Sequence, residues 1–381
     1  MKKIIVLGSG MVGSAMAIDL SKNHQVTICD INQKTLDKIR KKNKDLNVIY
    51  GDVTNKIELK SVIEPFDVVV CAVPGFLGFS TLKTIIEAKK DVVDISFFPE
   101  NALELNDLAK QNNVTAVVDC GVAPGMGNII LGYYNEQLKI SSFECLVGGL
   151  PKTKKWPFNY KAPFSPVDVI EEYTRPARFV ENGKIIIRKA LSDVEMVEFE
   201  KVGSLESFNS DGLRSLIFTM PHIPNMKEKT LRYPGHVEYI SVLKESGFFD
   251  QKSIKIKDVS ISPLDFTSKI LFNDWKLGEK EEELTVMRIS IKGLNNDGKT
   301  ENIVYSLYDE FSNATQTSSM ARTTGYTATA VVHLITENIF NEKGVFPPEL
   351  IGKHKACYQF VINYLKDRNV IYKKEITIEN E

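Results

Sequence analysis

The sequence predicts an α/β protein that is built on a doubly wound parallel sheet and carries an inserted α+β domain. Three observations lead to this expectation. Short runs rich in Val and Ile alternate with helical segments through residues 1–120, a glycine-rich turn follows the first of these runs, and longer alternating segments begin after Gly121. Near-continuous apolar runs are typical of parallel strands that are buried on both faces of a sheet.

The expected strands of the parallel sheet are short and follow one another at similar intervals. They lie at residues 4–7, 26–29, 48–50, 68–71, 92–95 and 116–118. The segments between them, such as 33–42 and 101–111, have the polar outer faces of crossover helices. Residues 1–123 are therefore expected to form a first domain.

The sequence after this domain predicts a different kind of sheet. Residues 143–147, 184–187 and 196–199 alternate apolar and polar side chains, which is typical of antiparallel strands with one exposed face. We expect residues 124–312 to form a catalytic and dimerisation domain, in which a partner subunit covers the sheet in a homodimer or a dimer of dimers. Residues 313–381 are expected to form helices that pack back on the first domain.

Composition excludes several classes of protein. The chain has 381 residues, of which 43% are hydrophobic and 25% charged, so it is long enough for about two globular domains. Its 48 basic and 49 acidic residues leave a net charge of -1, which provides no field to attract nucleic acid. No stretch is apolar enough to predict a membrane span, and the five scattered cysteines suit a reducing cytoplasm. The glycines near the start disfavour the alternative of a secretory signal.

The first expected strand leads directly into a glycine pattern that is typical of dinucleotide binding. Gly8, Gly10 and Gly13 are spaced as in the G-x-G-x-x-G turn of Rossmann folds, and Met11 and Val12 begin the helix that follows. Such a turn lets the backbone approach a pyrophosphate, which the positive end of the helix then attracts. We therefore predict a Rossmann domain, against the alternative of an unrelated glycine-rich turn.

Asp30 predicts which dinucleotide binds. It closes the second expected strand about 20 residues after the glycine turn, where a carboxylate accepts hydrogen bonds from the adenine ribose and repels a 2′-phosphate. The predicted cofactor is NAD rather than NADP, although Lys34 and Lys38 are close in the sequence and soften this preference.

The ends of later strands are expected to complete the cofactor site, because ligands of open α/β sheets lie at the carboxyl ends of the strands. These residues are Asp52, Val53, Ala72, Val73, Pro74, Ser96 and Gly121.

Several other segments hold polar residues among turn formers, beyond what structure alone requires. They include the neighbourhoods of Asp94, Arg175, Asp211, Arg214 and His236. Each has a structural alternative, since an arginine can pair with a surface acid and an Asp-Gly pair can form a turn that caps a helix.

Taken together, these segments resemble the saccharopine dehydrogenase-like family, and within it the lysine 6-dehydrogenase branch, over essentially the whole chain. The strings that carry the resemblance are VPGFLGF (73–79), VVDISFFPE (92–100), GVAPGMGNIILG (121–132), VGGLP (147–151), EEYTRPAR (171–178), SDGLRS (210–215), TLRYPGH (230–236) and ARTTGYT (321–327). The combination is specific to the superfamily and less specific to one substrate.

The resemblance implies an enzyme that oxidises the ε-carbon of L-lysine with NAD, releases ammonia and forms a semialdehyde that cyclises to piperideine-6-carboxylate. The related saccharopine reductases carry Asp where this chain has Ala123 and Cys where it has Val147, and these departures disfavour saccharopine as the substrate. The alternatives are a saccharopine dehydrogenase, another imine-forming amino acid or polyamine dehydrogenase, or, from a different class, a non-catalytic NAD-binding regulator.

The implied chemistry needs a base, because the amine must lose a proton before hydride leaves and water must then attack the imine. Asp94 and His236 are the candidates. The imidazole of His236 exchanges protons near neutrality, whereas Asp94 requires burial against the nicotinamide to become basic enough. The alternative for His236 is a hydrogen-bonded turn histidine.

The amino acid part of the substrate calls for an arginine that grips the α-carboxylate and an acid that holds the α-ammonium. Arg175, Arg214 and Arg232 are the candidate arginines, and Glu171 and Asp211 are the candidate acids. The histidines show no metal-ligand spacing and hydride transfer to NAD needs no metal, so no metal is predicted.

Overall fold

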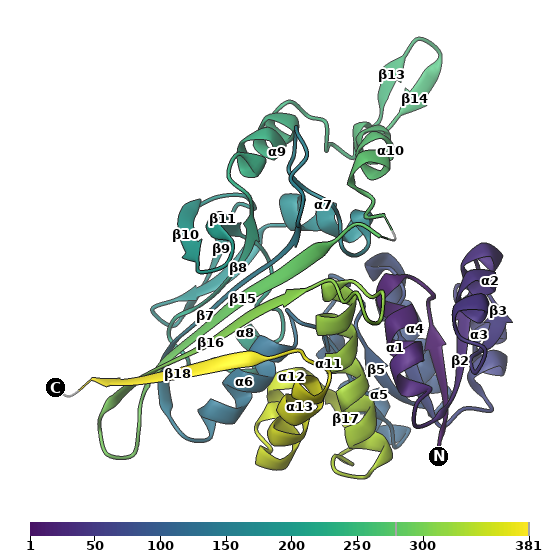
Figure 1. The fold of residues 1–381 in the computed structure, drawn as a ribbon, viewed down its shortest axis with the longest axis horizontal. Coiled ribbons are helices and arrows are strands. Elements are labelled where there is room, and N and C mark those ends of the chain that lie inside the picture. Colours follow the sequence, from purple (N-terminus) through teal and green to yellow (C-terminus); the bar gives the residue numbers. More distant parts are fainter. Residues whose placement is uncertain (279, 380–381) are drawn as a thin grey trace.

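Two sheets lie side by side in the computed structural model, which describes residues 1–278 and 280–379 (Figure 1). The smaller sheet belongs to the N-terminal part of the chain, and the larger sheet is formed mainly by the middle part. Within the described residues, every helix is too short or too polar to span a bilayer.

The smaller sheet has seven parallel strands in the order β17-β6-β5-β4-β1-β2-β3, which confirms the predicted doubly wound sheet. Each predicted run overlaps one strand, because near-continuous Val and Ile residues fill both faces of the sheet. The seventh strand, β17, was not predicted. The strands are β1 (Lys3–Leu7), β2 (Gln25–Asp30), β3 (Asn47–Tyr50), β4 (Val68–Cys71), β5 (Asp91–Asp94), β6 (Thr115–Val117) and β17 (Gly344–Phe346).

Helices cover both faces of this sheet. One face packs against α1 (Met11–Leu20), α2 (Gln33–Lys42) and α11 (Ser319–Thr336), and the other against α3 (Lys56–Ile63), α4 (Gly75–Glu87) and α5 (Asn106–Gln111). The helix expected over 101–111 is divided into a 3₁₀ turn, Ala102–Leu105, and α5. The turn begins after Asn101, whose side chain accepts a hydrogen bond from Leu103 N and so caps it.

The larger sheet is mixed, whereas the sequence predicted antiparallel pairing. Its strands follow the order β10-β11-β12-β7-β15-β16-β18, with β8 and β9 attached beside β12. The long strands β7 (Lys139–Pro151), β15 (Glu283–Leu294) and β16 (Thr300–Glu310) are antiparallel neighbours, but β12 (Met226–Arg232) runs parallel to β7. The chain between β7 and β12 passes through two helices, α7 and α8, and two hairpins, β8–β9 and β10–β11. Such a long crossover permits parallel pairing.

The remaining elements extend the larger sheet, cover the two sheets, or form a separate two-stranded sheet from β13 and β14. The strands are β8 (Ala177–Glu181), β9 (Lys184–Arg188), β10 (Glu195–Phe199), β11 (Gly203–Asn209), β13 (Ile254–Ile256), β14 (Val259–Ile261) and β18 (Tyr372–Glu379). The helices are α6 (Met126–Asn135), α7 (Pro166–Thr174), α8 (Leu216–Thr219), α9 (His236–Glu245), α10 (Pro263–Trp275), α12 (Pro348–Gly352) and α13 (Lys355–Asp367).

Helix α11 lies between the two sheets and is buried almost along its whole length. Half of its residues are Ala, Thr or Gly, which let it approach its neighbours closely, and Gly325 packs against Met16 of α1. The Ser318 side chain caps the helix by accepting a hydrogen bond from Ala321 N. A single hydrophobic core continues from the first sheet through α11 to the inner face of the second.

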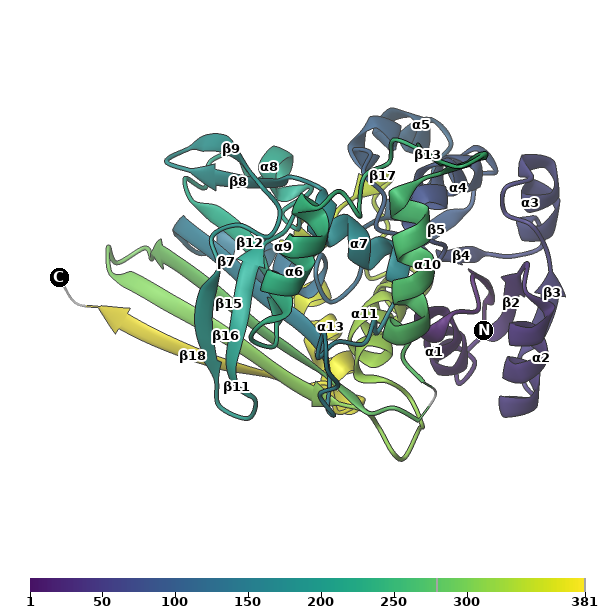
Figure 2. The same ribbon diagram turned by 90° about the horizontal axis from the view of Figure 1, so that it is seen from above.

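The C-terminal part of the chain divides between the two sheets, whereas the sequence led us to expect only helices against the first. Helix α13 packs on α11, and β17 extends the first sheet. The last strand, β18, pairs with β16 and forms the outer edge of the second sheet (Figure 2). The two sheets are therefore connected by three separate passages of the chain.

Helices α6 and α12 touch through two glycines. A Cβ atom at Gly132 would lie 2.1 Å from the carbonyl oxygen of Glu349, and one at Gly352 would lie 2.0 Å from that of Ile129. Both approaches are far below van der Waals contact, so the backbones meet only because these positions lack a side chain.

We predict that Gly132→Ala lowers the free energy of unfolding by about 1–3 kcal/mol, because the added methyl group must push α6 away from α12. Thermal and urea unfolding measure the change. Gly127→Ala is the matched control in the same helix, since its Cβ meets no atom closer than 3.4 Å. The account of this contact fails if the two variants unfold alike.

Candidate active site

A cavity of about 1250 Å³ lies between the two domains. The first domain contributes the carboxyl ends of β1 to β5, and the second contributes α7, β12 and the loop that leads into α11. The cavity is larger than a typical pocket for one small ligand, which suits a dinucleotide together with a substrate. Its position at the strand ends is the one expected for an open α/β sheet.

The glycine turn after β1 has the geometry of a pyrophosphate cradle. Gly8 has a φ of 105°, and a Cβ at Gly13 would lie 2.1 Å from the carbonyl oxygen of Gly8, so neither position accepts a side chain. No atom lies within 4 Å of an ideal Cβ at Gly10, and no side chain caps α1 there. The amides at the start of α1 therefore face open space, as a bound phosphate requires.

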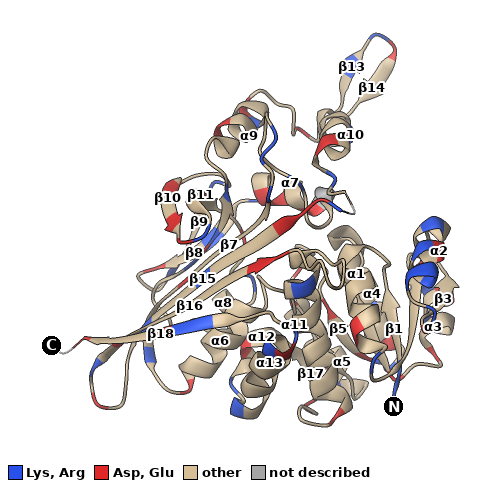
Figure 3. Cartoon of the chain, in the orientation of Figure 1, with Lys and Arg blue, Asp and Glu red and all other residues tan. Residues whose placement is uncertain are grey.

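Asp30 is fixed to this turn at the end of β2. Its Oδ2 accepts hydrogen bonds from Ser9 N at 2.6 Å and Ser9 Oγ at 2.7 Å, and its Oδ1 accepts one from Asn32 N at 2.7 Å. Each carboxylate oxygen has more than one lone pair, so the group retains acceptor capacity toward a ribose. Lys34 and Lys38 of the basic helix α2 line the same end of the cavity (Figure 3).

Every residue predicted to hold the cofactor lines this cavity, and its role toward NAD stays a prediction. The residues are Gly8, Gly10, Met11, Val12, Gly13, Asp30, Asp52, Val53, Ala72, Val73, Pro74, Ser96 and Gly121. They come from separate strand ends, and the parallel sheet brings these ends to one edge.

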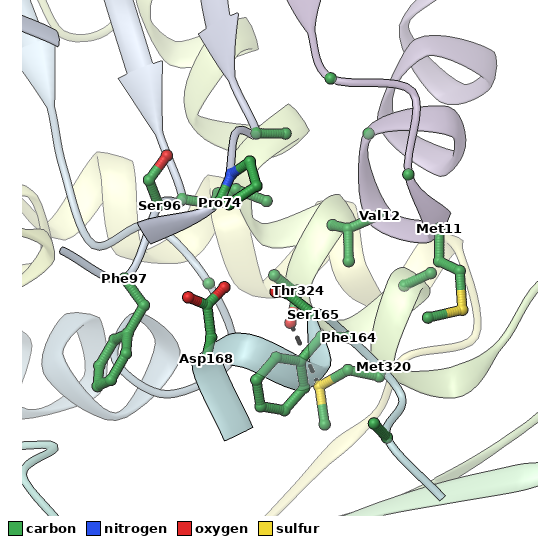
Figure 4. Close-up of a pocket in the computed structure, with 18 of the residues that line it drawn as sticks. Met11, Val12, Pro74, Ser96, Phe97, Phe164, Ser165, Asp168, Met320 and Thr324 are labelled. Atoms are coloured by element: carbon green, nitrogen blue, oxygen red, sulfur yellow. Dashed lines mark hydrogen bonds between the residues drawn. The ribbon is translucent and has the colours of Figure 1, made fainter. Parts of the chain in front are cut away.

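Asp168 is a cavity residue that the sequence reasoning missed. It lies on α7, and its carboxylate points into the cavity on the side where Pro74 and Ser96 end their strands (Figure 4). Its Oδ1 accepts a hydrogen bond from Gly75 N at 3.3 Å. Burial raises the pKa of Asp168 to about 6, and the nearby Glu171 carboxylate acts in the same direction. The group can therefore exchange a proton near neutrality.

One face of α7 supplies most of the charged groups on the second domain's side of the cavity. Glu171, Glu172 and Arg175, the last of which directly follows α7, stand three, four and seven residues after Asp168, and all four line the cavity. This spacing places residues on one side of a helix. The helical spacing of these charged residues is the sequence pattern that could have indicated Asp168 as a site residue. Arg175 donates from Nη2 to Glu171 Oε2 at 3.2 Å, whereas its buried Nη1 has no partner among the described residues.

Arg214 and Arg232, two of the arginines predicted to bind substrate, already have protein partners. Arg214 lies outside the cavity and donates to Asp119 Oδ1 at 2.8 Å and to the Phe98 carbonyl oxygen at 2.7 Å. Arg232 lines the cavity but is held by Glu172 Oε2 at 2.7 Å. Arg175 is therefore the predicted arginine with the most freedom to bind a carboxylate.

The two predicted acids line the cavity and are also paired. Asp211 accepts two hydrogen bonds from the Arg178 guanidinium, at 2.9 Å from Nε and 2.8 Å from Nη2, and a third from Arg178 N at 3.2 Å. Glu171 pairs with Arg175. Their negative charge is thus largely neutralised within the protein, which leaves less of it for a substrate ammonium group.

His236 does not line the cavity, and this corrects its prediction as the base. Its Nε2 lies 2.9 Å from the Tyr173 hydroxyl and its Nδ1 lies 2.9 Å from the Phe158 carbonyl oxygen. Burial and the charge of Arg232 lower the pKa of His236 to about 3. The geometry agrees with the alternative of a hydrogen-bonded structural histidine.

Asp94, the other predicted base, lies behind the cavity wall and is also corrected. It is fully buried and accepts hydrogen bonds from Ser96 N at 2.8 Å and Ser96 Oγ at 3.3 Å. Burial raises the pKa of Asp94 to about 7. Its contacts make it a positioning residue for Ser96, which does line the cavity.

Two protein families match the sequence. Residues 4–117 match the saccharopine dehydrogenase NADP binding domain, and residues 121–371 match the saccharopine dehydrogenase C-terminal domain. The chain belongs to the saccharopine dehydrogenase family. The predicted resemblance is confirmed, and a nicotinamide dinucleotide is the cofactor that the first of these domains indicates.

Curated relatives cover the chain at low identity. The mitochondrial alpha-aminoadipic semialdehyde synthase of Rattus norvegicus is 22% identical over 99% of this chain and 48% of its own length. The saccharopine dehydrogenase [NADP(+), L-glutamate-forming] of Saccharomyces cerevisiae is 24% identical over 67% of this chain and 60% of its own length. The chain thus spans about half the length of the rat relative.

A solved structure has the same fold. It is the apo form of saccharopine dehydrogenase (L-Glu forming) from Saccharomyces cerevisiae, which superimposes with a TM-score of 0.79 at 20% identity, over 99% of this chain and 100% of the other. The likeness therefore extends over both domains.

We predict that Asp30→Ser lowers the ratio of kcat/KM for NAD to that for NADP by about tenfold or more, because the change removes a charge-assisted acceptor and a repulsion toward the 2′-phosphate. Steady-state kinetics with both cofactors measure the ratio. Asp37→Ser on the neighbouring helix α2 is the control, since Asp37 accepts a hydrogen bond from Gln33 and does not line the cavity. An unchanged ratio in the Asp30→Ser variant would contradict the predicted role of Asp30 in cofactor preference.

Proposed function

We propose that this protein oxidises the ε-carbon of L-lysine with NAD, releasing ammonia and the semialdehyde that cyclises to piperideine-6-carboxylate. The observation that carries the proposal is the buried Asp168 carboxylate, which faces the cavity beside the ends of β4 and β5. A group with a pKa of about 6 at this place is suited to accept a proton from an amine that is about to be oxidised.

The residues of this chain would divide the reaction between them. The substrate ε-ammonium gives one proton to Asp168, and the neutral amine can then lose hydride from its ε-carbon. Bound NAD supplies the chemistry of a hydride acceptor. Water adds to the resulting iminium carbon, and the carbon–nitrogen bond breaks to release ammonia and the aldehyde. Asp168 is placed to return its proton to the departing nitrogen or to accept one from the water.

Arg175 is the group best placed to bind the substrate α-carboxylate. Its unpartnered Nη1 is buried, and its guanidinium lies 4.9 Å from the centre of the Phe97 ring, which also lines the cavity. A buried N–H without an acceptor is costly, so a carboxylate ligand would stabilise it. Because Arg175 directly follows α7, about two turns beyond Asp168, the two groups would bind opposite ends of one amino acid.

The cavity walls support lysine over saccharopine. Ala123 and Val147 both line the cavity, and they are the positions at which saccharopine reductases carry Asp and Cys. Apolar side chains there offer no hydrogen bond to the glutamate arm of saccharopine. Saccharopine remains the second candidate substrate, because the yeast relative is a saccharopine dehydrogenase.

The first test is a turnover assay with purified protein, NAD and separate samples of L-lysine, saccharopine and cadaverine. We expect L-lysine to give NADH and ammonia in equal amounts, measured by absorbance and by an ammonia assay. NADH formation with saccharopine alone, together with glutamate, would replace the proposed substrate. Binding of NAD without turnover of any amine would favour a non-catalytic regulator.

We predict that Asp168→Asn lowers kcat by about 10²-fold or more, because a positioned base contributes rate factors of this size. In the wild type, Asp168 is protonated below a pKa of about 6, so kcat/KM should fall as the pH decreases through that value. The variant should lose this acidic limb. Asp107→Asn on the exposed start of α5 is the control. An Asp168→Asn enzyme that keeps the limb would assign it to another group.

A further inference from the structure

Glu228 is a buried acid in the cavity, and Arg214, whose charge lowers its pKa, is itself paired with Asp119. It lies on β12, is 4% exposed, and lines the cavity. Among the residues that the structure describes, no donor forms a hydrogen bond or a salt bridge with its carboxylate. A buried carboxylate that faces a cavity without a partner carries a large desolvation cost.

The neighbouring acids differ from Glu228 in this respect. Asp119 pairs with Arg214 at 2.8 Å, Asp211 with Arg178 at 2.8 Å, and Glu172 with Arg232 at 2.7 Å. All three acids are close enough to Glu228 to raise its pKa electrostatically. Each of these three acids is therefore paired with its own arginine, whereas Glu228 has no such pair and can accept one from a cationic ligand.

The backbone makes room for the Glu228 carboxylate at one glycine. An ideal Cβ at Gly212 would lie 1.8 Å from Glu228 Oε1, so any other residue at position 212 would displace the carboxylate. Gly212 also lines the cavity. The absence of a side chain there keeps the acid against the cavity wall and exposed to a ligand.

Glu228 and Asp168 are separate charged positions on the substrate side. Glu172 lies near both of them, since Asp168 raises the pKa of Glu172 and Glu172 raises that of Glu228. A substrate with two amino groups would satisfy both acids, one group reacting beside Asp168 and the other resting against Glu228.

We propose that Glu228 binds the α-ammonium group of the substrate and so selects amino acids with a second, distant amine. This inference rests on the proposed function, in which the distant amine is the one that reacts. The contact completes the set of ion pairs around the cavity, and it leaves Arg175 to the α-carboxylate. Burial raises the pKa of Glu228 to about 8, and an ammonium ligand would lower it again by stabilising the ionised form.

The test compares two ligands that differ only in the α-ammonium group, L-lysine and 6-aminohexanoate. Both are titrated into the NADH complex by calorimetry, where no turnover takes place. We expect the wild type to bind L-lysine about tenfold or more tightly than 6-aminohexanoate, since a charge-assisted hydrogen bond contributes at least this much. In Glu228→Gln the two ligands should bind alike.

Two further variants separate this role from a structural one. Gly212→Ala keeps the carboxylate but displaces it, so it should also remove the preference for L-lysine. Glu144→Gln on the neighbouring strand β7, which pairs with Lys227 at the surface, should keep the preference. Thermal unfolding of each variant shows whether its fold is retained.

The binding and turnover experiments test the ammonium site and the proposed reaction separately. If the wild type prefers L-lysine through Glu228 but does not oxidise it, the ammonium site stands and the proposed reaction falls. If the wild type binds both ligands equally, or Glu228→Gln retains the preference, the inference about Glu228 is overturned even when L-lysine is oxidised.

Discussion

The packing of α11 between the two sheets is the constraint on which the rest of the structure depends. This helix is buried along almost its whole length, and its small residues bring α1 of the first domain and β15 of the second close to it. One hydrophobic core therefore continues through both domains. The walls of the cavity belong to different parts of the chain, but the same core fixes their positions relative to each other. A site for hydride transfer requires such fixed positions.

The features that the sequence could predict are those that local patterns determine. Apolar runs indicated the parallel strands, and the glycine turn and Asp30 indicated the end of the cavity suited to a dinucleotide. The C-terminal strands β17 and β18 and the parallel pairing of β12 with β7 depend on contacts between distant segments, and no local pattern specifies them. The same reason explains His236 and Arg214, whose residue types suited the chemistry but whose partners, Tyr173 and Asp119, lie far away in the sequence.

The charge that the cavity offers to a ligand depends on which charged groups are paired with one another, and not only on how many there are. Acids are frequent on the second domain's side, yet several are matched by arginines that lie in or behind the wall. Such pairs stabilise the shape of the wall and offer little further interaction to a ligand. Asp168, Glu228 and the Nη1 atom of Arg175 are the groups that this pairing leaves to a ligand. Residue type does not show which charged groups are paired in the folded protein. The sequence therefore did not distinguish the paired groups from those that can bind a ligand.

In the proposed function, α7 connects the group that accepts the proton with the group that binds the substrate carboxylate. Asp168 lies on α7 and Arg175 directly follows its last residue, about two turns further on, so the helix largely sets the distance between the proposed proton acceptor and the proposed carboxylate-binding group. The helix would therefore determine which substrate length fits between the two groups. A sliding or rotation of α7 would move both groups together. A substrate of a different chain length would therefore have to be accommodated by changes in the opposite wall of the cavity.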